Sequence, residues 1–235
     1  MSAPRVWVTR ARPGSEATAT RVGAMGFEPV VAPLLEVRAL AGGEIDLADV
    51  AALAFTSVNG VRYFAVGCAR RDLPVFVVGA STAAAARSTG FRSVVSAGAD
   101  VEALATVIAA HGPFAGAVLH AGPTEPAGDL PGALFALGVE ARALAVYETV
   151  ERPRDPQTAA LVPTCRAALL HSPKASLVLA GYLTIAGAPN LTAICLSAKV
   201  AAPLVGKELA AVHAAGAPTE AALLSLLTGC VPVHP

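Results

Sequence analysis

Small polar side chains stand where predicted β-strands end and predicted helices begin. Thr9 and Arg10 follow one apolar run, and Ser57 and Asn59 follow another. In a parallel α/β sheet such junctions form the carboxyl edge, where ligands bind. A guanidinium there can hold a carboxylate through two parallel hydrogen bonds, and N–H groups at a helix start attract anions. The pattern predicts a site for an acidic ligand, although turn residues and plain helix caps would give the same sequence.

The other candidates of this kind also follow predicted strands. A glycine at a strand end lets the backbone approach a ligand closely, and hydroxyl groups cap the next helix. Tight turns, helix caps and a solvated lysine are the alternatives that the sequence leaves open. These candidates are Gly79, Ser81, Thr82, Ser172, Lys174 and Ser197.

Tyr147 is the candidate proton donor. It is one of only three tyrosines and lies in an extended, β-prone segment. A phenol with a pKa near 10 can donate a proton at neutral pH and is a poor base. A packing tyrosine with its hydroxyl at the surface is the alternative. The five histidines have no Ser, Cys or Asp partner in the sequence, and we assign them no catalytic role.

Composition excludes several classes of protein. The chain has 235 residues, of which 54% are hydrophobic and 14% charged, so it is expected to fold. Its net charge is zero, which leaves no overall field to bind nucleic acid or an anionic membrane. Charged residues, glycine or proline interrupt every apolar stretch before the roughly 18 to 20 residues that span a bilayer. Residues 1–10 contain no secretion signal, which favours the cytoplasm.

Familiar cofactor and hydrolase motifs are missing from the sequence. It contains no GxGxxG or P-loop signature, no GxSxG elbow and no HExxH. The four cysteines are scattered and have no histidine at ligand spacing, so we expect neither a disulfide framework nor a metal site. We therefore expect no cofactor, and any anionic ligand must be held by local groups.

Short β-rich runs alternate with stretches of helical period, which indicates an α/β fold with parallel sheets. The first elements are a strand at 5–9, a helix at 16–25 and a strand at 28–32, followed by strands at 51–56 and 75–79. Several patterns recur in the same order after about 115 residues, which suits a duplicated domain. Residues 55–57, for example, resemble residues 170–172. Two similar α/β units are expected.

Two extended segments, 35–40 and 146–152, occupy equivalent places in the two repeats. Each is β-prone and is followed by a polar or glycine-rich stretch. They are candidates for paired linkers between the units.

Taken together, these residues resemble uroporphyrinogen-III synthase. The resemblance covers nearly the whole chain, and its strength lies in the order and spacing of weak motifs. They are Val8-Thr9-Arg10 with Pro13, Gly26, Pro33-Leu34, Phe55-Thr56-Ser57 with Asn59, Val78-Gly79 with Thr82, Gly90, residues 119–138, Val146-Tyr147-Glu148, Ser172-Pro173 and Gly216-Ala217-Pro218-Thr219.

The resemblance implies two flavodoxin-like parallel-sheet domains joined by a two-stranded β linker. One domain would be discontinuous, with residues 1–36 and 152–235, and the other would span 40–146. The implied reaction is cyclisation of hydroxymethylbilane to uroporphyrinogen III, with loss of water and inversion of ring D and with no metal or organic cofactor. The implied enzyme is a cytoplasmic hydro-lyase of tetrapyrrole and haem biosynthesis. Because the sequence identifies no large exposed apolar face, a monomer is the default expectation, and any contact with hydroxymethylbilane synthase would be transient.

The resemblance also assigns roles to the candidates. Tyr147 would help the departing hydroxyl by giving it a proton, and the other candidates would hold the eight carboxylates of the substrate. Two departures concern this assignment. The family often has Arg-Gly where this chain has Ala121-Gly122 after His120, and Ser197 stands where glycine is usual. Pro203 is expected to kink or shorten the helix that follows Ser197.

Two alternatives to the enzyme remain open. A non-catalytic, two-lobed protein that closes on a small ligand would share the duplication and the helix starts. Most such proteins carry a secretion signal and have no need of a tyrosine at the hinge. An inactive homologue of the synthase would keep the fold and lose the reaction.

Overall fold

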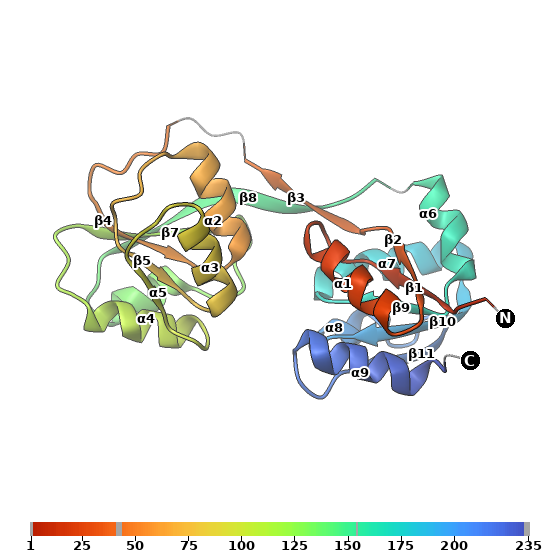
Figure 1. Ribbon diagram of the computed structural model, residues 1–235. Helices are drawn as coiled ribbons and strands as arrows, with labels where there is room; N and C mark the ends of the chain where they lie inside the picture. Colours follow the sequence, from red (N-terminus) through yellow and green to blue (C-terminus); the bar gives the residue numbers. More distant parts are fainter. Residues whose placement is uncertain (1, 41–43, 154, 233–235) are drawn as a thin grey trace. The chain divides into compact units, whose positions relative to one another are not determined.

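The chain folds into two compact units. The computed structural model describes residues 2–40, 44–153 and 155–232, apart from the side chains of residues 184–186. Unit 1 consists of Met1–Val37 and Val150–Pro235, and unit 2 is Arg38–Thr149. The chain passes from unit 1 to unit 2 along β3 (Leu35–Ala39) and returns along β8 (Ala141–Glu151) (Figure 1).

β3 and β8 are neighbouring strands of one sheet. The Leu40 N–H donates to the Val146 carbonyl at 3.2 Å, and the Arg152 N–H donates to the Leu34 carbonyl at 3.0 Å. The residue numbers rise along β3 while those of the paired residues on β8 fall, so the two strands run antiparallel. The segments expected to be linkers therefore pair with each other, and β8 extends further toward the N-terminus than the expected segment did.

Unit 1 has a five-stranded sheet in the order β11-β10-β9-β1-β2, with all neighbours parallel. Besides part of β3, its elements are β1 (Arg5–Val8), α1 (Gly14–Ala24), β2 (Glu28–Val31), α6 (Pro156–Leu161), the 3₁₀ turn η1 (Val162–Thr164), β9 (Ala167–Leu170), α7 (Pro173–Ala186), β10 (Ala188–Cys195), α8 (Ala198–Ala201), the 3₁₀ turn η2 (Ala202–Leu204), β11 (Leu209–Ala214) and α9 (Glu220–Cys230).

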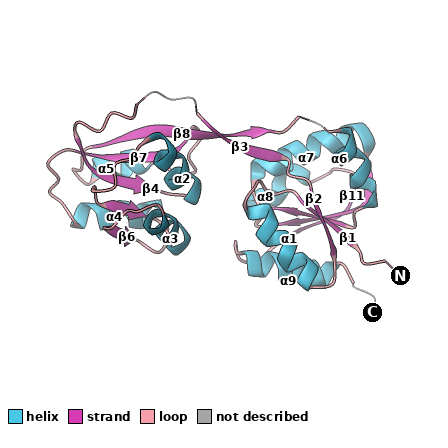
Figure 2. Ribbon diagram, turned by 45° about the horizontal axis from the view of Figure 1, so that its top comes forward, coloured by secondary structure: helices cyan, strands magenta, loops and turns pink. Residues whose placement is uncertain are grey.

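Alternating residues of these strands build two cores, one on each face of the sheet. Val6, Leu169 and Ile194 pack with α1 and α9 on one face. Trp7 and Leu170 pack with α7, α8 and η2 on the other. Side chains alternate along a strand, so strands buried on both faces read as continuous apolar runs. The result is a sheet between two helical layers (Figure 2).

Unit 2 has the same architecture. Its sheet has the order β3-β8-β7-β4-β5-β6, and the five strands after β3 are parallel. Besides β3 and β8, its elements are β4 (Val50–Phe55), α2 (Val58–Gly67), β5 (Val75–Val77), α3 (Ala80–Ser88), β6 (Val94–Ser96), α4 (Val101–Ala110), β7 (Ala117–Pro123) and α5 (Leu130–Ala136). One face carries α4 and α5, and on the other Phe55 packs edge-on against Phe64 of α2 at 5.5 Å between ring centres.

The two sheets have equivalent strand orders. In unit 1 the strands β9, β10 and β11 lie side by side in this order, and in unit 2 the strands β4, β5 and β6 do the same. On the other side of β9 lie β1 and then β2, and on the other side of β4 lie β7 and then β8. The expected α/β fold with two similar parallel-sheet units is confirmed.

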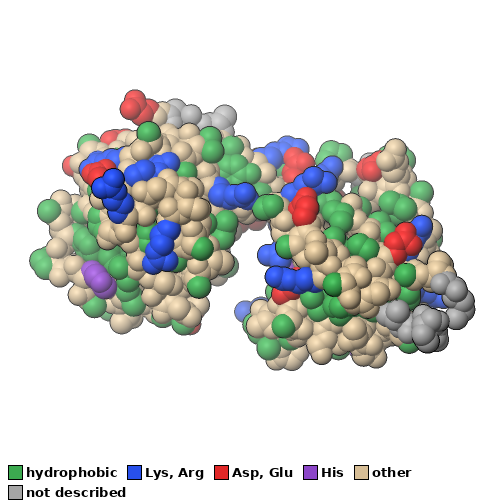
Figure 3. All heavy atoms as spheres, viewed as in Figure 1, with side chains coloured by type: hydrophobic (Ala, Val, Ile, Leu, Met, Phe, Trp, Pro, Cys, Tyr) green, Lys and Arg blue, Asp and Glu red, His purple; other side chains and the backbone are tan. Residues whose placement is uncertain are grey.

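No helix within the described residues is long and apolar enough to cross a membrane. Acidic and basic side chains are interspersed over the face shown in Figure 3, as the net charge of zero suggests.

Candidate functional site

The carboxyl edge of the unit 2 sheet brings two of the predicted site residues into contact. Ser57 follows β4 and Tyr147 lies on β8, and their hydroxyl oxygens are 3.0 Å apart. The two residues are ninety positions apart in the sequence. The phenol proposed as proton donor therefore has a hydrogen-bond partner from the first helix cap of its own unit.

Helix α2 fixes the Ser57 side chain. Ser57 is the N-cap of α2, and its Oγ accepts a hydrogen bond from the Gly60 N–H at 3.0 Å. A Cβ on Gly60 would lie 2.7 Å from the Ala121 carbonyl oxygen, so only glycine lets the start of α2 lie this close to β7. The cap and the close approach together orient Ser57 toward Tyr147.

Tyr147 is held in its protonated form. Its residue surface is 6% exposed, and its ring stacks on Tyr63 at 5.6 Å between ring centres. Burial raises the pKa of Tyr147, while the Ser57 hydrogen bond opposes part of that rise. A Ser57 hydroxyl that donates to the phenol oxygen stabilises the phenolate. The pair therefore suits a proton donor at neutral pH, and Ser57 would ease the transfer.

His120 is the buried titratable group beside this pair. It is 3% exposed, and its Nε2 lies 3.3 Å from the Thr56 hydroxyl. Burial lowers the pKa of His120, so the imidazole is neutral at pH 7. It therefore supplies no positive charge at the place where the resemblance implies an arginine.

The other predicted residues of unit 2 lie at the same edge, and within the described part of the chain none of them is hydrogen-bonded to Tyr147. Gly79 is the N-cap of α3, and a Cβ built there would meet no atom within 4 Å. Ser81 is exposed in the first turn of α3, whereas Thr82 is 4% exposed. Asn59 is half-buried in the first turn of α2.

In unit 1, Arg10 follows β1 at the carboxyl edge and meets Glu220, the first residue of α9. Arg10 Nη1 lies 3.4 Å from Glu220 Oε2. Glu220 also accepts a hydrogen bond from the Thr18 hydroxyl at 2.6 Å, and its Oε2 lies 2.9 Å from His171 Nε2. Arg21 Nη1 is 3.9 Å from Glu220 Oε1. One carboxylate thus joins α1, α9 and the ends of β1 and β9.

Glu220 is ionised throughout the neutral range. Its side chain is 17% exposed. Hydrogen bonds from His171 and Thr18, with the nearby charge of Arg10, lower the pKa of Glu220 to about 2, although burial acts in the opposite direction. The other ring nitrogen of His171 is buried and has no partner within the described part of the chain.

We expect the contribution of Glu220 to stability to be lost in acid. Its folded-state pKa lies below the ordinary value of 4.5, so the stabilisation is present above about pH 4.5 and disappears as the pH falls toward 2. Glu220→Gln should lower the free energy of unfolding of unit 1 by about 1–3 kcal/mol at pH 7.

Urea titrations followed by the fluorescence of Trp7 measure this difference, because Trp7 is the single tryptophan and is buried in unit 1. The gap between wild type and variant should shrink from pH 7 to pH 3. An equal gap at both values would contradict the assignment.

The remaining predicted residues of unit 1 lie at strand ends and helix starts. Thr9 is 1% exposed, and its hydroxyl donates to the Leu169 carbonyl at 2.6 Å, which ties β1 to β9. Ser172 caps α7 by accepting a hydrogen bond from the Ala175 N–H at 3.2 Å, and Lys174 lies in the first turn. Ser197 is the N-cap of α8, which ends at Ala201 before a 3₁₀ turn that contains Pro203. Pro203 therefore accompanies a shortened helix.

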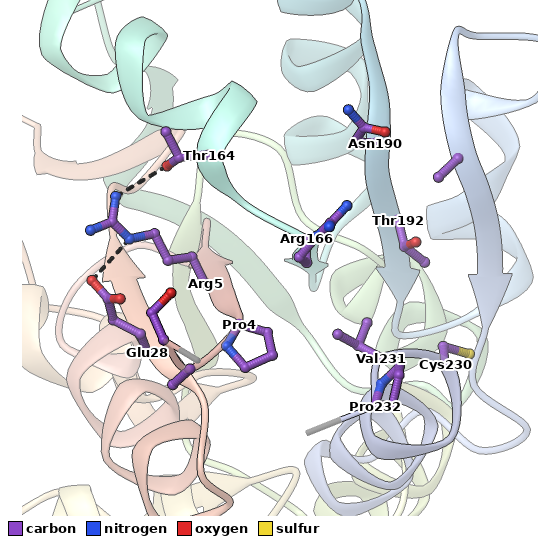
Figure 4. A pocket seen from close by; sticks show the side chains of 13 residues that line it. Pro4, Arg5, Glu28, Thr164, Arg166, Asn190, Thr192, Cys230, Val231 and Pro232 are labelled. Carbon is purple, nitrogen blue, oxygen red and sulfur yellow. Dashed lines mark hydrogen bonds and ion pairs between the residues drawn. The ribbon is translucent and has the colours of Figure 1, made fainter. Parts of the chain in front are cut away.

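A hollow of about 950 Å³ lies at the opposite, amino edge of the unit 1 sheet (Figure 4). Arg5 lies there between Glu28, at 3.0 Å, and Thr164, at 3.4 Å, so its charge is already paired. None of the predicted site residues lines this hollow. It is therefore separate from the candidate site.

A comparison with protein-family models decides the family. The model described as Uroporphyrinogen-III synthase HemD matches residues 16–225. The chain belongs to this family. The resemblance seen in the sequence is thereby confirmed, although no curated protein matches the chain.

Solved structures of the synthase share the fold. The uroporphyrinogen-III synthetase of Helicobacter pylori matches with a TM-score of 0.70 at 18% identity, over 97% of this chain and 99% of that chain. A mutant uroporphyrinogen III synthase of Thermus thermophilus matches with a TM-score of 0.56 at 15% identity, over 97% of this chain and 98% of that chain. At these identities the matches establish the two-domain α/β fold.

Sequence reasoning missed Glu220, His171 and His120 as parts of the site. A glutamate in the first turn of a helix is ordinary, because it interacts favourably with the helix dipole. Its contacts with Arg10 and His171 join residues 210 and 49 positions apart, and no local pattern reports them. Within the described residues, no group of three or more His, Cys, Asp or Glu could hold a metal ion.

Proposed function

We propose that this protein is a uroporphyrinogen-III synthase that cyclises hydroxymethylbilane to uroporphyrinogen III, losing water and inverting ring D. The family match over residues 16–225 is the observation that carries the proposal. The contact between Ser57 and Tyr147 supports it, because it gives a protonated phenol a partner that stabilises the phenolate.

The first step is loss of the terminal hydroxyl. The pyrrole nitrogen pushes its electron pair toward the hydroxymethyl carbon, the carbon–oxygen bond breaks, and Tyr147 gives its proton to the departing oxygen, which leaves as water. An azafulvenium cation and a phenolate remain, and the phenolate accepts the Ser57 hydrogen bond. General acid catalysis of this kind needs a donor that is protonated at the working pH, as burial ensures for Tyr147.

The later steps need orientation rather than a strong nucleophile. The substituted α-carbon of ring D attacks the cation to form a spiro intermediate. The bond between that α-carbon and the methylene bridge to ring C then breaks, which leaves an azafulvenium cation on ring C. The unsubstituted α-carbon of ring D attacks that methylene carbon, and the proton lost from the α-carbon returns to the phenolate. Holding the chain in the curve that favours attack at the substituted carbon supplies the selectivity.

Local groups would hold the substrate carboxylates, since the protein has no net charge. Arg10 provides a guanidinium at the carboxyl edge of unit 1, and α2, α3 and α7 start at the carboxyl edges with capping or small residues. The remaining predicted residues keep their proposed part in this binding, with Thr9 acting through the strand end that it fixes.

Genetic complementation tests the proposal in a cell. The gene should restore growth without added haem to a bacterium whose own uroporphyrinogen-III synthase gene is deleted, because the substrate is then cyclised to the III isomer. An empty vector is the control, and an immunoblot shows that the protein is present. Accumulation of the type I isomer in cells that contain the protein would favour an inactive homologue.

A further inference from the structure

The Arg10 side chain lies across the first residue of helix α1. A Cβ on Gly14 would lie 2.5 Å from Arg10 Nε and 2.9 Å from both Cδ and Cζ. Real Cβ atoms do not approach other heavy atoms so closely, so this path of the guanidinium exists only because residue 14 is glycine. Gly14 has no positive φ that would require glycine for backbone reasons.

The far end of the same guanidinium is held from another helix. Arg10 Nη1 lies 3.4 Å from Glu220 Oε2. Glu220 is itself fixed by Thr18 and His171, at 2.6 and 2.9 Å. Arg10 is therefore held by packing over α1 on one side and by a charged partner from α9 on the other.

We propose that Gly14 and Glu220 are positioning residues that hold the Arg10 guanidinium ready for a substrate carboxylate. This inference rests on the proposed function and deepens it, because it names what orients one of the carboxylate-binding groups. Gly14 and Glu220 need not touch the substrate, and they act through Arg10.

Two features make the held guanidinium a good ligand for a carboxylate. Arg10 is 45% exposed in its side chain, and within the described residues only Nη1 has a partner, so Nε–H and Nη2 donors remain for a ligand. Arg10 and Arg21 carry two positive charges against the single negative charge of Glu220, so the cluster keeps a positive surplus. A side chain fixed before binding also loses less conformational entropy when the ligand arrives.

Gly14→Ala is the decisive variant, because it moves Arg10 without changing any charge. We expect KM for hydroxymethylbilane to rise by about 3- to 10-fold with little change in kcat, the range that follows from freeing one long side chain. Alanine is the better helix former, so the helix itself is not weakened. Gly23→Ala in the same helix is the matched control, since a Cβ there meets nothing within 4 Å.

A double-mutant cycle separates positioning from a general structural effect. Adding Gly14→Ala to Arg10→Ala should raise KM no further, because Gly14 then has no guanidinium to direct. Glu220→Gln should raise KM in the wild-type background and likewise do little more in the Arg10→Ala background. An unchanged KM in Gly14→Ala, or full additivity in the cycle, would overturn the proposal.

An NMR measurement keeps the positioning separate from the reaction. The ¹⁵N-coupled Nε–H signal of Arg10, assigned by its loss in Arg10→Lys, should shift and exchange faster in Gly14→Ala while Gly23→Ala leaves it unchanged. Identical Arg10 signals in wild type and Gly14→Ala would refute the restraint. If the wild-type protein cyclises no hydroxymethylbilane, both the proposed function and the role of Arg10 in binding a substrate carboxylate are wrong. The NMR result still decides separately whether Gly14 and Glu220 hold the Arg10 side chain.

Discussion

Replacing Tyr147 by phenylalanine should lower kcat for uroporphyrinogen III formation by at least about tenfold, the lower end of what a general acid contributes. The variant keeps the ring that stacks on Tyr63 and loses only the hydroxyl hydrogen-bonded to Ser57. Initial rates with freshly prepared hydroxymethylbilane measure the change, and circular dichroism checks the fold.

Tyr182→Phe is the matched control for this variant. Tyr182 is partly buried and packs edge-on against Trp7 of the unit 1 core, whereas Tyr147 belongs to unit 2, so loss of the Tyr182 hydroxyl should leave kcat nearly unchanged. Equal kcat values for Tyr147→Phe and wild type would remove Tyr147 from the mechanism.

Replacing Arg10 by alanine should raise KM by roughly 10- to 100-fold, the range expected when a charge-assisted hydrogen bond to a carboxylate is lost. The effect should exceed that of Gly14→Ala, which displaces the guanidinium without removing it. Arg10→Lys should fall between the two because it keeps the charge and loses the planar fork. Initial rates over a range of substrate concentrations give KM and kcat separately.

Arg12→Ala is the control for Arg10→Ala. The Arg12 side chain is 71% exposed and pairs with Glu16 of α1 at 3.2 Å, so its loss removes an equal charge two residues away. An equal rise of KM in both variants would mean that general charge, and not a held guanidinium, attracts the substrate. No rise in either would return Arg10 to a structural role.

Much of the fold can be read from the sequence because the local signals agree with the global structure. The run at 5–9 becomes β1, which lies inside the sheet and is apolar after Arg5, and the run at 28–32 becomes the edge strand β2. Gly90 follows α3 and has a φ of +99°, which favours glycine. Ser57, Ser172 and Thr219 cap helices through their hydroxyl oxygens.

The site was only partly predictable because its contacts are distant in sequence. The residue types of Arg10 and Tyr147 and their places in or beside extended segments predict their roles. Their partners were not predicted, since Ser57 was expected to hold a ligand and Glu220 was overlooked. The sequence also does not show which polar side chains are buried. Thr9 follows its strand, as a ligand-binding residue would, yet its hydroxyl donates a hydrogen bond to the Leu169 carbonyl.

His120 shows how environment overrides residue type. The resemblance leads one to expect an arginine after it, where this chain has Ala121. Its surroundings leave it 3% exposed and lower its pKa, so it is a neutral hydrogen-bonding group beside Thr56. A positive charge at this point of unit 2 would require a different residue.

The most direct test of the account is the isomer composition of the product. Purified protein is mixed with freshly generated hydroxymethylbilane, the products are oxidised, and the type I and type III uroporphyrins are separated by chromatography. The account predicts mainly type III, formed at a rate proportional to protein concentration. Type I alone, at the rate of the protein-free control, would contradict it and leave a member of the family that keeps the fold without the reaction.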